Sequence, residues 1–230
     1  MKRLIVIVLV LLTCLPALYA RRKSPKSGEI KKNVYTDATY DFKFKLLENW
    51  DPELRKPDDN IRLVLQQEDH EIPPDLMQYP QMARVPEMEV YITEMDMHPS
   101  VFVDSMVSQT YSSDVKNDIL GPIKVVEERI SFEGLRTLNK RSTMIDSLEA
   151  VIWQGTVHFI KDLGMGETIP RTYAVGFIGV KNGDLMLAFM MSCEEMFVGD
   201  VFTEVIEMAE SLQWPPLDEQ KKKGKDEDED

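Results

Sequence analysis

The sequence predicts an α+β fold, a single α/β/α sandwich with a mainly antiparallel sheet and a long C-terminal helix. Three observations lead to this prediction. Apolar and polar residues alternate over most of the chain, which is the periodicity of strands. Helical spacing of apolar residues is confined to residues 101–111 and 197–212. Asn182-Gly183, a pair typical of two-residue hairpin turns, joins two late strands and indicates antiparallel pairing.

The first strands are predicted from alternation. Residues 40–46 (YDFKFKL) alternate apolar with charged side chains and predict a half-buried strand, followed by a turn at Trp50. Residues 61–65 predict a second strand and residues 88–92 a third. Between these two, residues 73–86 contain four prolines, which predict a loop because proline interrupts regular structure.

A helix is predicted next, over residues 101–111, with Ser100 as its N-cap. Two apolar segments follow, residues 123–132 and 135–145, and predict a hairpin that turns at Gly134. Both helix and hairpin fit an antiparallel sheet with a helix laid on it.

The last strands are residues 151–160, 173–180 and 185–191. The final two are joined at Asn182-Gly183, where a two-residue turn requires positive φ at both positions. Residues 185–191 are apolar on both faces, which predicts a central strand covered by helices on both sides.

The C-terminal helix has a predicted start and stop. Ser192 and Glu195 have the spacing of a capping box, with Ser192 as N-cap. Apolar residues recur behind them at spacings of three and four up to Leu212. Pro215 ends the helix, because proline excludes the preceding residue from the α region.

Residues 1–20 predict a cleaved secretory signal. Lys2 and Arg3 precede an unbroken apolar run over residues 4–12, and Ala20 is the expected cleavage point. The run is shorter than the ~20 residues that span a bilayer, and no later segment is long and apolar enough to cross a membrane. We therefore expect an exported protein, periplasmic or extracellular.

An alternative interpretation of the signal makes Cys14 the lipidated first residue of a lipoprotein. It ranks second, because Thr13 is larger than the Gly, Ala or Ser that normally precedes such a cysteine. After cleavage at Ala20 the chain keeps only Cys193, so no internal disulfide can form.

The mature chain divides into three parts. Residues 21–33 are polar and basic and predict a flexible tether. Residues 34–214 form one domain of ordinary size. Residues 215–230 begin with two prolines, contain almost no apolar residues and predict a disordered charged tail.

The charge balance argues against nucleic-acid binding. Removal of residues 1–20 takes away two basic residues and no acidic ones, so 25 basic residues remain against 40 acidic ones. The formal net charge thereby moves from -13 to -15. Binding to phosphate backbones depends on clustered Lys and Arg, so nucleic acid is not an expected partner.

The sequence contains no motif that identifies a reaction. Its serines lack a G-x-S-x-G elbow, and there is no glycine loop of the kind that cradles phosphates. His70, His98 and His158 stand alone, without the spacing of paired ligands. We therefore expect neither catalysis nor a cofactor.

One stretch suggests a metal. Met95 and Met97 would share one face of a strand, and His98 follows them. Thioether and imidazole ligands suit Cu(I), so a periplasmic soft-metal binding protein is the alternative function. Further ligands could come from residues 190–193 if the fold brought them close. Methionine is also common core filler, which is the preferred interpretation.

Two ends of the predicted domain resemble those of PsbP-like domains. One is the aromatic strand over residues 40–44 with Asn49-Trp50 behind it, and the other is the hairpin over residues 181–184 with an apolar strand, a helix and Trp214. The resemblance covers residues 34–214. It implies an α/β/α sandwich and an exported accessory or binding role, since the namesake in plant photosystem II is an extrinsic, non-catalytic subunit. We thus expect a non-enzymatic protein of the cell envelope that binds a protein or another envelope component.

Overall fold

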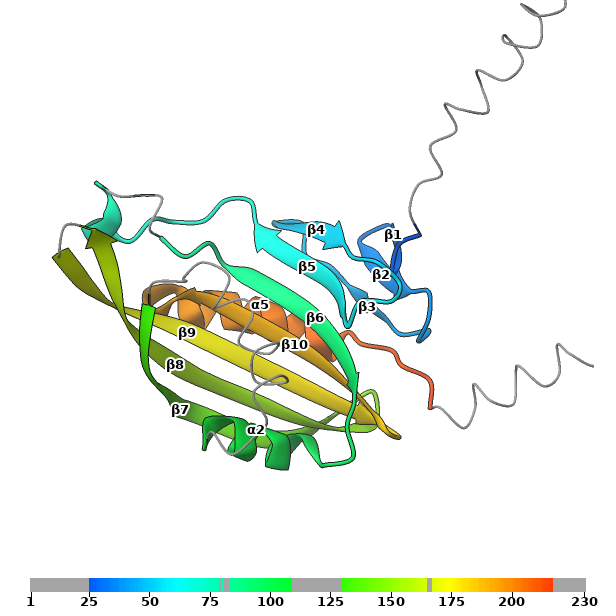
Figure 1. Cartoon of the computed structure of the whole chain (residues 1–230). Coiled ribbons are helices and arrows are strands. Elements are labelled where there is room, and N and C mark those ends of the chain that lie inside the picture. Colours follow the sequence, from blue (N-terminus) through cyan, green and yellow to red (C-terminus); the bar gives the residue numbers. More distant parts are fainter. Residues whose placement is uncertain (1–24, 79, 81–82, 109–129, 165–166, 217–230) are drawn as a thin grey trace, which may run out of the picture.

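The computed structural model describes residues 25–78, 80, 83–108, 130–164 and 167–216. Its centre is a seven-stranded sheet in which all neighbouring strands are antiparallel, in the order β4-β5-β6-β10-β9-β8-β7 (Figure 1). The strands are Trp50–Leu54 (β4), Ile61–Gln67 (β5), Glu87–Glu94 (β6), Ile130–Ile145 (β7), Leu148–Gly164 (β8), Glu167–Asn182 (β9) and Leu185–Glu194 (β10). The predicted α+β class with a mainly antiparallel sheet is confirmed.

A helix lies on each face of this sheet. In β10, Leu187 and Phe189 belong to the core cluster beneath helix α5 (Val198–Glu210). Met186 and Ala188 point the opposite way, into the cluster beneath helix α2 (Pro99–Val107). Alternation therefore gives β10 two apolar faces, as predicted, because both faces are covered.

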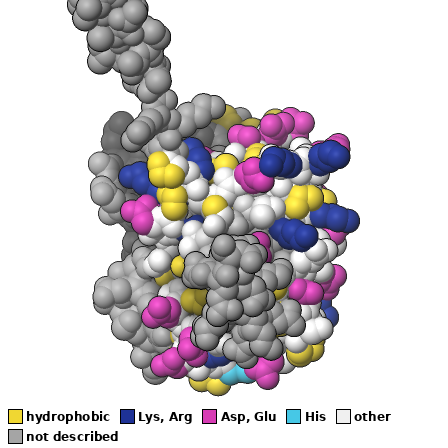
Figure 2. All heavy atoms as spheres, turned by 90° about the vertical axis from the view of Figure 1, so that its right-hand side faces the viewer, with side chains coloured by type: hydrophobic (Ala, Val, Ile, Leu, Met, Phe, Trp, Pro, Cys, Tyr) yellow, Lys and Arg dark blue, Asp and Glu magenta, His cyan; other side chains and the backbone are white. Residues whose placement is uncertain are grey.

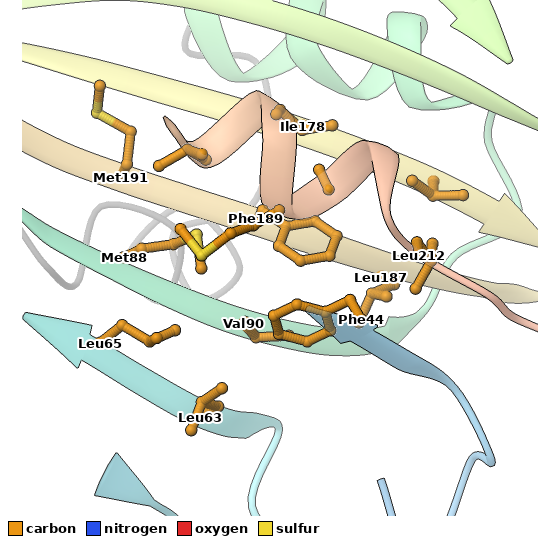
Figure 3. Close-up of a cluster of buried hydrophobic side chains, with 14 of the residues drawn as sticks. Phe44, Leu63, Leu65, Met88, Val90, Ile178, Leu187, Phe189, Met191 and Leu212 are labelled. Atoms are coloured by element: carbon orange, nitrogen blue, oxygen red, sulfur yellow. The ribbon is translucent and has the colours of Figure 1, made fainter. Parts of the chain in front are cut away.

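A second, three-stranded sheet covers the α5 side of the molecule. Its strands are Gly28–Lys31 (β1), Val34–Asp37 (β2) and Lys43–Lys45 (β3), in that order. Phe44 of β3 packs edge-on against Phe189 of β10, with ring centroids 5.1 Å apart (Figure 3). Trp214, which follows α5 in the sequence, packs edge-on against Phe42, with ring centroids 5.8 Å apart. Aromatic contacts thus hold the small sheet, the large sheet and the C-terminal segment together.

Several N-terminal predictions are wrong. Residues 28–31, expected in the flexible tether, form β1, and Ser27 before them is fully buried. The strand expected over residues 40–46 shrinks to β3, since Asp41 has a φ of 54° that breaks the extended backbone. Trp50 begins β4 instead of lying in a turn.

The middle of the chain brings two corrections. His98, not Ser100, caps helix α2: its Nδ1 accepts a hydrogen bond from the Ser100 backbone N–H at 3.1 Å. No hairpin turns at Gly134, because β7 runs through this residue as one strand. The hairpin lies between β7 and β8, at Asp146 and Ser147, which have φ values of 48° and 65°. Residues 109–129 lie outside the described part.

The C-terminal hairpin is confirmed, but its turn is shifted by one residue. Asn182 still pairs with Leu185, so Gly183 and Asp184 are the central residues. Only Gly183 has a positive φ, 60°. A positive φ at the first central residue alone is the pattern of a type II′ turn, which favours glycine there.

The predicted capping box is also wrong. Ser192 is fully buried within β10, and the strand continues to Glu194 before a 3-10 turn, Glu195–Phe197, leads into α5. The Ser192 hydroxyl accepts hydrogen bonds from the Arg84 guanidinium at 2.8 and 3.0 Å. Ser192, which the sequence pattern assigned to the N-cap of a helix, therefore accepts hydrogen bonds from an arginine far away in the sequence.

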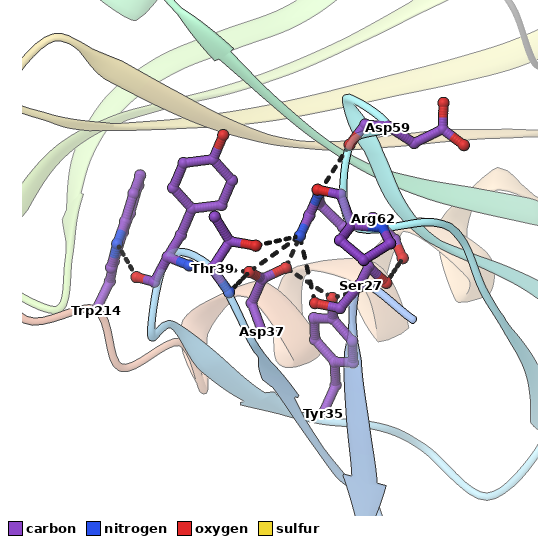
Figure 4. A network of polar contacts seen from close by, with 9 residues as sticks. Ser27, Tyr35, Asp37, Thr39, Asp59, Arg62 and Trp214 are labelled. Carbon is purple, nitrogen blue, oxygen red and sulfur yellow. Dashed lines mark hydrogen bonds and ion pairs between the residues drawn. The ribbon is translucent and has the colours of Figure 1, made fainter. Parts of the chain in front are cut away.

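A buried polar network joins the small sheet to the large one (Figure 4). The guanidinium of Arg62 on β5 donates to the Asp37 carboxylate on β2, with 2.8 Å from Nε to Oδ2, and both side chains are at most 1% exposed. The Tyr35 hydroxyl donates to the same carboxylate at 2.8 Å. Burial and the charge of Asp37 raise the pKa of Tyr35 above its ordinary value. Burial lowers the pKa of Arg62, but the hydrogen bond and charge of Asp37 outweigh it, so the net shift is upward.

A second buried cluster fastens the proline-rich loop to the end of the sheet. Glu194 accepts from the Arg84 backbone N–H at 2.7 Å and from the guanidinium of Arg171 on β9. The other arm of Arg171 donates to Asp75 at 2.7 Å. Every carboxylate named here has a cationic or backbone donor, whereas the Nε of Arg171 is buried with no hydrogen-bond partner among the described residues.

The ends of the chain, residues 1–24 and 217–230, lie outside the described residues. They include Ala20, Cys14 and most of the expected tail. Within the described part, no helix is long and apolar enough to cross a membrane.

Candidate functional site

The predicted soft-metal residues lie just beyond a strand instead of on it. β6 ends at Glu94, and Met95 and Met97 follow in a loop beside a hollow of about 520 Å³, lined by residues 94–97. Met95 is 5% exposed and belongs to the core cluster under α2, while Met97 packs partly buried against that cluster. Both thioethers therefore contribute to packing around the helix.

The backbone of these residues lies against a lysine. The ammonium group of Lys181 donates hydrogen bonds to the carbonyl oxygens of Met95, Asp96 and Met97, at 2.8, 2.8 and 3.2 Å. His98 uses Nδ1 to cap α2, and its Nε2 lies 3.6 Å from a Glu149 carboxylate oxygen. Within the described residues, no group of three or more His, Cys, Asp or Glu side chains is placed to hold a metal ion.

Cu(I) binding by Met95, Met97 and His98 stays a prediction. If it holds, purified chain lacking residues 1–20 binds Cu(I) in an anaerobic titration with a chelator competitor. A Met95→Leu/Met97→Leu/His98→Ala variant then binds at least about tenfold more weakly. Equal binding by both proteins would remove the metal hypothesis.

The methionines and cysteine of β10 are divided between the faces of the sheet. Met190 lies in the cluster under α2, whereas Met191 and Cys193 lie in the cluster under α5. The structure therefore does not bring Cys193 together with the loop after β6. Burial raises the pKa of the Cys193 thiol to about 12, and the Glu194 charge adds to this.

The Cys193 thiol yields a pH prediction. Its pKa is above the ordinary 9.0 in the folded chain, so its contribution to stability is complete below pH ~9 and is lost as the pH rises toward 12. We expect the urea midpoint of the chain lacking residues 1–20 to fall more between pH 8 and pH 10 than that of Cys193→Ala. An equal fall in both proteins would show that the thiol titrates normally.

The outer edge of β7 has no partner among the described strands. β7 has 16 residues, against about 5–6 for a typical strand, and pairs with β8 on one side only. No described strand pairs with its other side, so that side presents a row of backbone N–H and C=O groups. We call this side, over residues 135–145, the β7 edge.

The opposite edge of the sheet is protected. β4 has five residues, and Pro52 stands at its centre, opposite Leu65 of β5. Proline has no backbone N–H to donate, and short edge strands give few positions for pairing. An added strand therefore has a much longer template at β7 than at β4.

Two of the large exposed hydrophobic side chains belong to the β7 edge. Among the described residues, the large exposed hydrophobics are Met77, Val101, Leu138, Met144 and Met196. Leu138, 51% exposed, and Met144, 58% exposed, both belong to β7, and Val101 belongs to α2, which packs beside β7. Apolar contact area is thus available next to the unpaired backbone.

Two basic side chains lie on one face of the β7 edge. Arg136 is opposite Thr156 of β8, and Arg141 is opposite Ile152. Five residues separate the arginines in sequence, a spacing that would put them on opposite faces of a regular strand. A register shift between Thr137 and Asn139 leaves Leu138 unpaired, so both arginines share a face.

The charge of the described surface is locally mixed although the chain is acidic overall. Figure 2 shows Lys and Arg side chains gathered beside Asp and Glu on one face. On β7, residues 135–145 contain three basic residues and no acidic one. The β7 edge is therefore a basic strand in a chain of net charge -13.

No protein-family model matches this chain, and no curated protein matches it. Among solved structures, cyanobacterial PsbP from Synechocystis sp. PCC 6803 is 12% identical with a TM-score of 0.43, and the match covers 85% of this chain and 96% of that one. LpqN, involved in cell envelope biogenesis of Mycobacterium tuberculosis, is 11% identical with a TM-score of 0.43, over 76% and 83%. Protein PA94 of Pseudomonas aeruginosa is 10% identical with a TM-score of 0.37, over 72% and 88%.

A PsbP structure is thus among those similar to this chain, as the resemblance seen in the sequence predicted. At 10–12% identity and TM-scores of 0.37–0.43, the likeness assigns no role to any residue. The function proposed below depends on the geometry of the chain itself.

Proposed function

We propose that this chain is an exported, non-enzymatic binding or accessory protein of the cell envelope, built as an α/β/α sandwich, and that the β7 edge is its binding surface. The observation that carries the proposal is the length of β7 without a described partner on its outer side. Addition of a strand to such an edge is a common mode of protein recognition. Export is supported by the signal pattern in residues 1–20.

Two further features support the β7 edge as the binding surface. Leu138 and Met144 supply exposed apolar area on the strand itself. The β7–β8 pair is also supported by its neighbours, because β8 lies between β7 and β9 and packs on α2. A binding strand on a fixed scaffold loses little order when a partner docks.

The proposal is tested by recovering partners from envelope extract with immobilised chain lacking residues 1–20. A Leu138→Ser/Met144→Ser variant is expected to lose a partner that the wild type recovers, because it removes the apolar contact without changing the charge of the strand. Met77→Ser/Met196→Ser is the matched control, since these exposed methionines are not part of β7. Recovery of no partner by the wild type, or equal recovery by both variants, would contradict the proposal.

A further inference from the structure

Arg136 and Arg141, which share one face of the β7 edge, restrict which strands can pair with it. Arg136 and Arg141 face β8 residues that are four positions apart, which in a strand corresponds to about 13 Å. Both side chains are exposed, and neither forms a salt bridge with a described residue. Lys140 differs, because its ammonium group is held by Asp104 of α2 at 2.6 Å. Two exposed arginine side chains therefore share one face of β7 without an ion pair to another described residue.

A second copy of this chain is a poor occupant of the edge. Two β7 strands paired with each other would place arginine rows beside one another, and like charges across a strand pair are destabilising. The buried area of such a pairing would also have to offset the mutual repulsion of two acidic chains.

The C-terminal tail of the same chain is a poor occupant as well. Pro216, the last described residue, lies beside the β7–β8 turn, since residues 146–147 and 213–216 line a common hollow. A tail that ran back along β7 from there would bring residues 221–223 (KKK) about as far along the strand as Arg141. Like charges would then meet at Arg141, and the acidic residues 226–230 would reach only Arg136, so the tail supplies a carboxylate to one arginine at most.

We propose that the β7 edge accepts an extended acidic segment of a partner protein as an added strand, with two carboxylates four residues apart opposite Arg136 and Arg141. The backbone groups of β7 supply the ladder, and each guanidinium can hold a carboxylate through two parallel hydrogen bonds. This inference rests on the proposed function and adds the chemistry of the partner. Spacing, not only charge, is the recognised feature.

The test uses synthetic peptides and chain lacking residues 1–20. The probe is a labelled nine-residue peptide that alternates Thr and Val, with Glu at its third and seventh positions. A matched peptide has Glu at its third and sixth positions, which lie on opposite faces of a strand, and another has Lys in place of both Glu. Binding is measured by fluorescence anisotropy at low and high salt.

We expect the first peptide to bind at least about tenfold more tightly than the other two, and to weaken with salt. An Arg136→Glu/Arg141→Glu variant should lose this binding and gain binding to the Lys peptide. Lys43→Glu/Lys45→Glu makes the same charge change on exposed residues of β3 and should bind like the wild type. Circular dichroism verifies that each variant is folded.

Several outcomes would overturn the inference. One is equal binding of the two Glu peptides, and another is binding that survives Arg136→Glu/Arg141→Glu. Concentration-dependent dimerisation that this variant abolishes would assign the edge to a second copy. Binding that appears only after removal of residues 217–230 would assign it to the tail. If partner recovery from extract still depends on Leu138 and Met144 while no acidic peptide binds, the inference fails and the proposed function stands.

Discussion

Asp37→Asn is expected to lower the free energy of unfolding by about 3–5 kcal/mol, because it leaves the Arg62 guanidinium buried without a counter-charge. Both side chains are at most 1% exposed, so water cannot replace the lost partner. The Asp37 carboxylate also accepts from the Tyr35 hydroxyl and from the backbone N–H of Thr39, each at 2.8 Å. Urea unfolding followed by tryptophan fluorescence measures the change.

Glu53→Gln is the matched control for Asp37→Asn. It removes the carboxylate of the Glu53–Arg55 pair, which has a similar N–O distance of 2.7 Å but lies at the surface. An exposed pair contributes about 0–1 kcal/mol, so this variant should stay close to the wild type. If the two variants lose the same stability, the network does not lock the small sheet to the large one.

Phe189→Ala is expected to be comparably severe, with a loss of about 3–5 kcal/mol. Phe189 is fully buried on β10, where it contacts Phe44 of β3 within the cluster beneath α5. Truncation leaves a cavity where the large sheet, the small sheet and the helix meet. Met77→Ala, at a residue 68% exposed, should change stability by less than about 0.5 kcal/mol. A small effect of Phe189→Ala would mean that the small sheet packs independently.

The parts of the fold that were predictable are those with strong local patterns. The apolar residues on both faces of β10 and the helical spacing in α5 can be recognised from the residues of each element alone. The start of α5 was misplaced because Ser192 is buried against Arg84, which is 108 positions away in sequence. Local spacing carries no information about such a partner.

Short and irregular strands were missed for physical reasons. β1 has four residues and no apolar alternation, and β4 contains Pro52, so neither has a strand signature of its own. They are strands because a neighbouring strand supplies partners for their backbone hydrogen bonds. The buried Asp37–Arg62 pair was missed as well, because buried charges look like surface charges in a sequence.

The candidate site could be predicted only in part from the sequence. The pattern after β6 drew attention to Met95, Met97 and His98, but it did not indicate that Lys181 would lie against their backbone. At the β7 edge, a spacing of five would put Arg136 and Arg141 on opposite faces of a regular strand. The irregularity at Leu138, which depends on pairing with β8, places them together.

Amide hydrogen exchange tests the central claim, that the β7 edge is the binding surface, most directly. The chain lacking residues 1–20 is compared with and without a partner recovered from envelope extract. We expect slower exchange at alternate amides of residues 135–145, those that point away from β8, and no change at β4. Protection of β4, or of the exposed surfaces of α2 or α5, with β7 unchanged would contradict the claim.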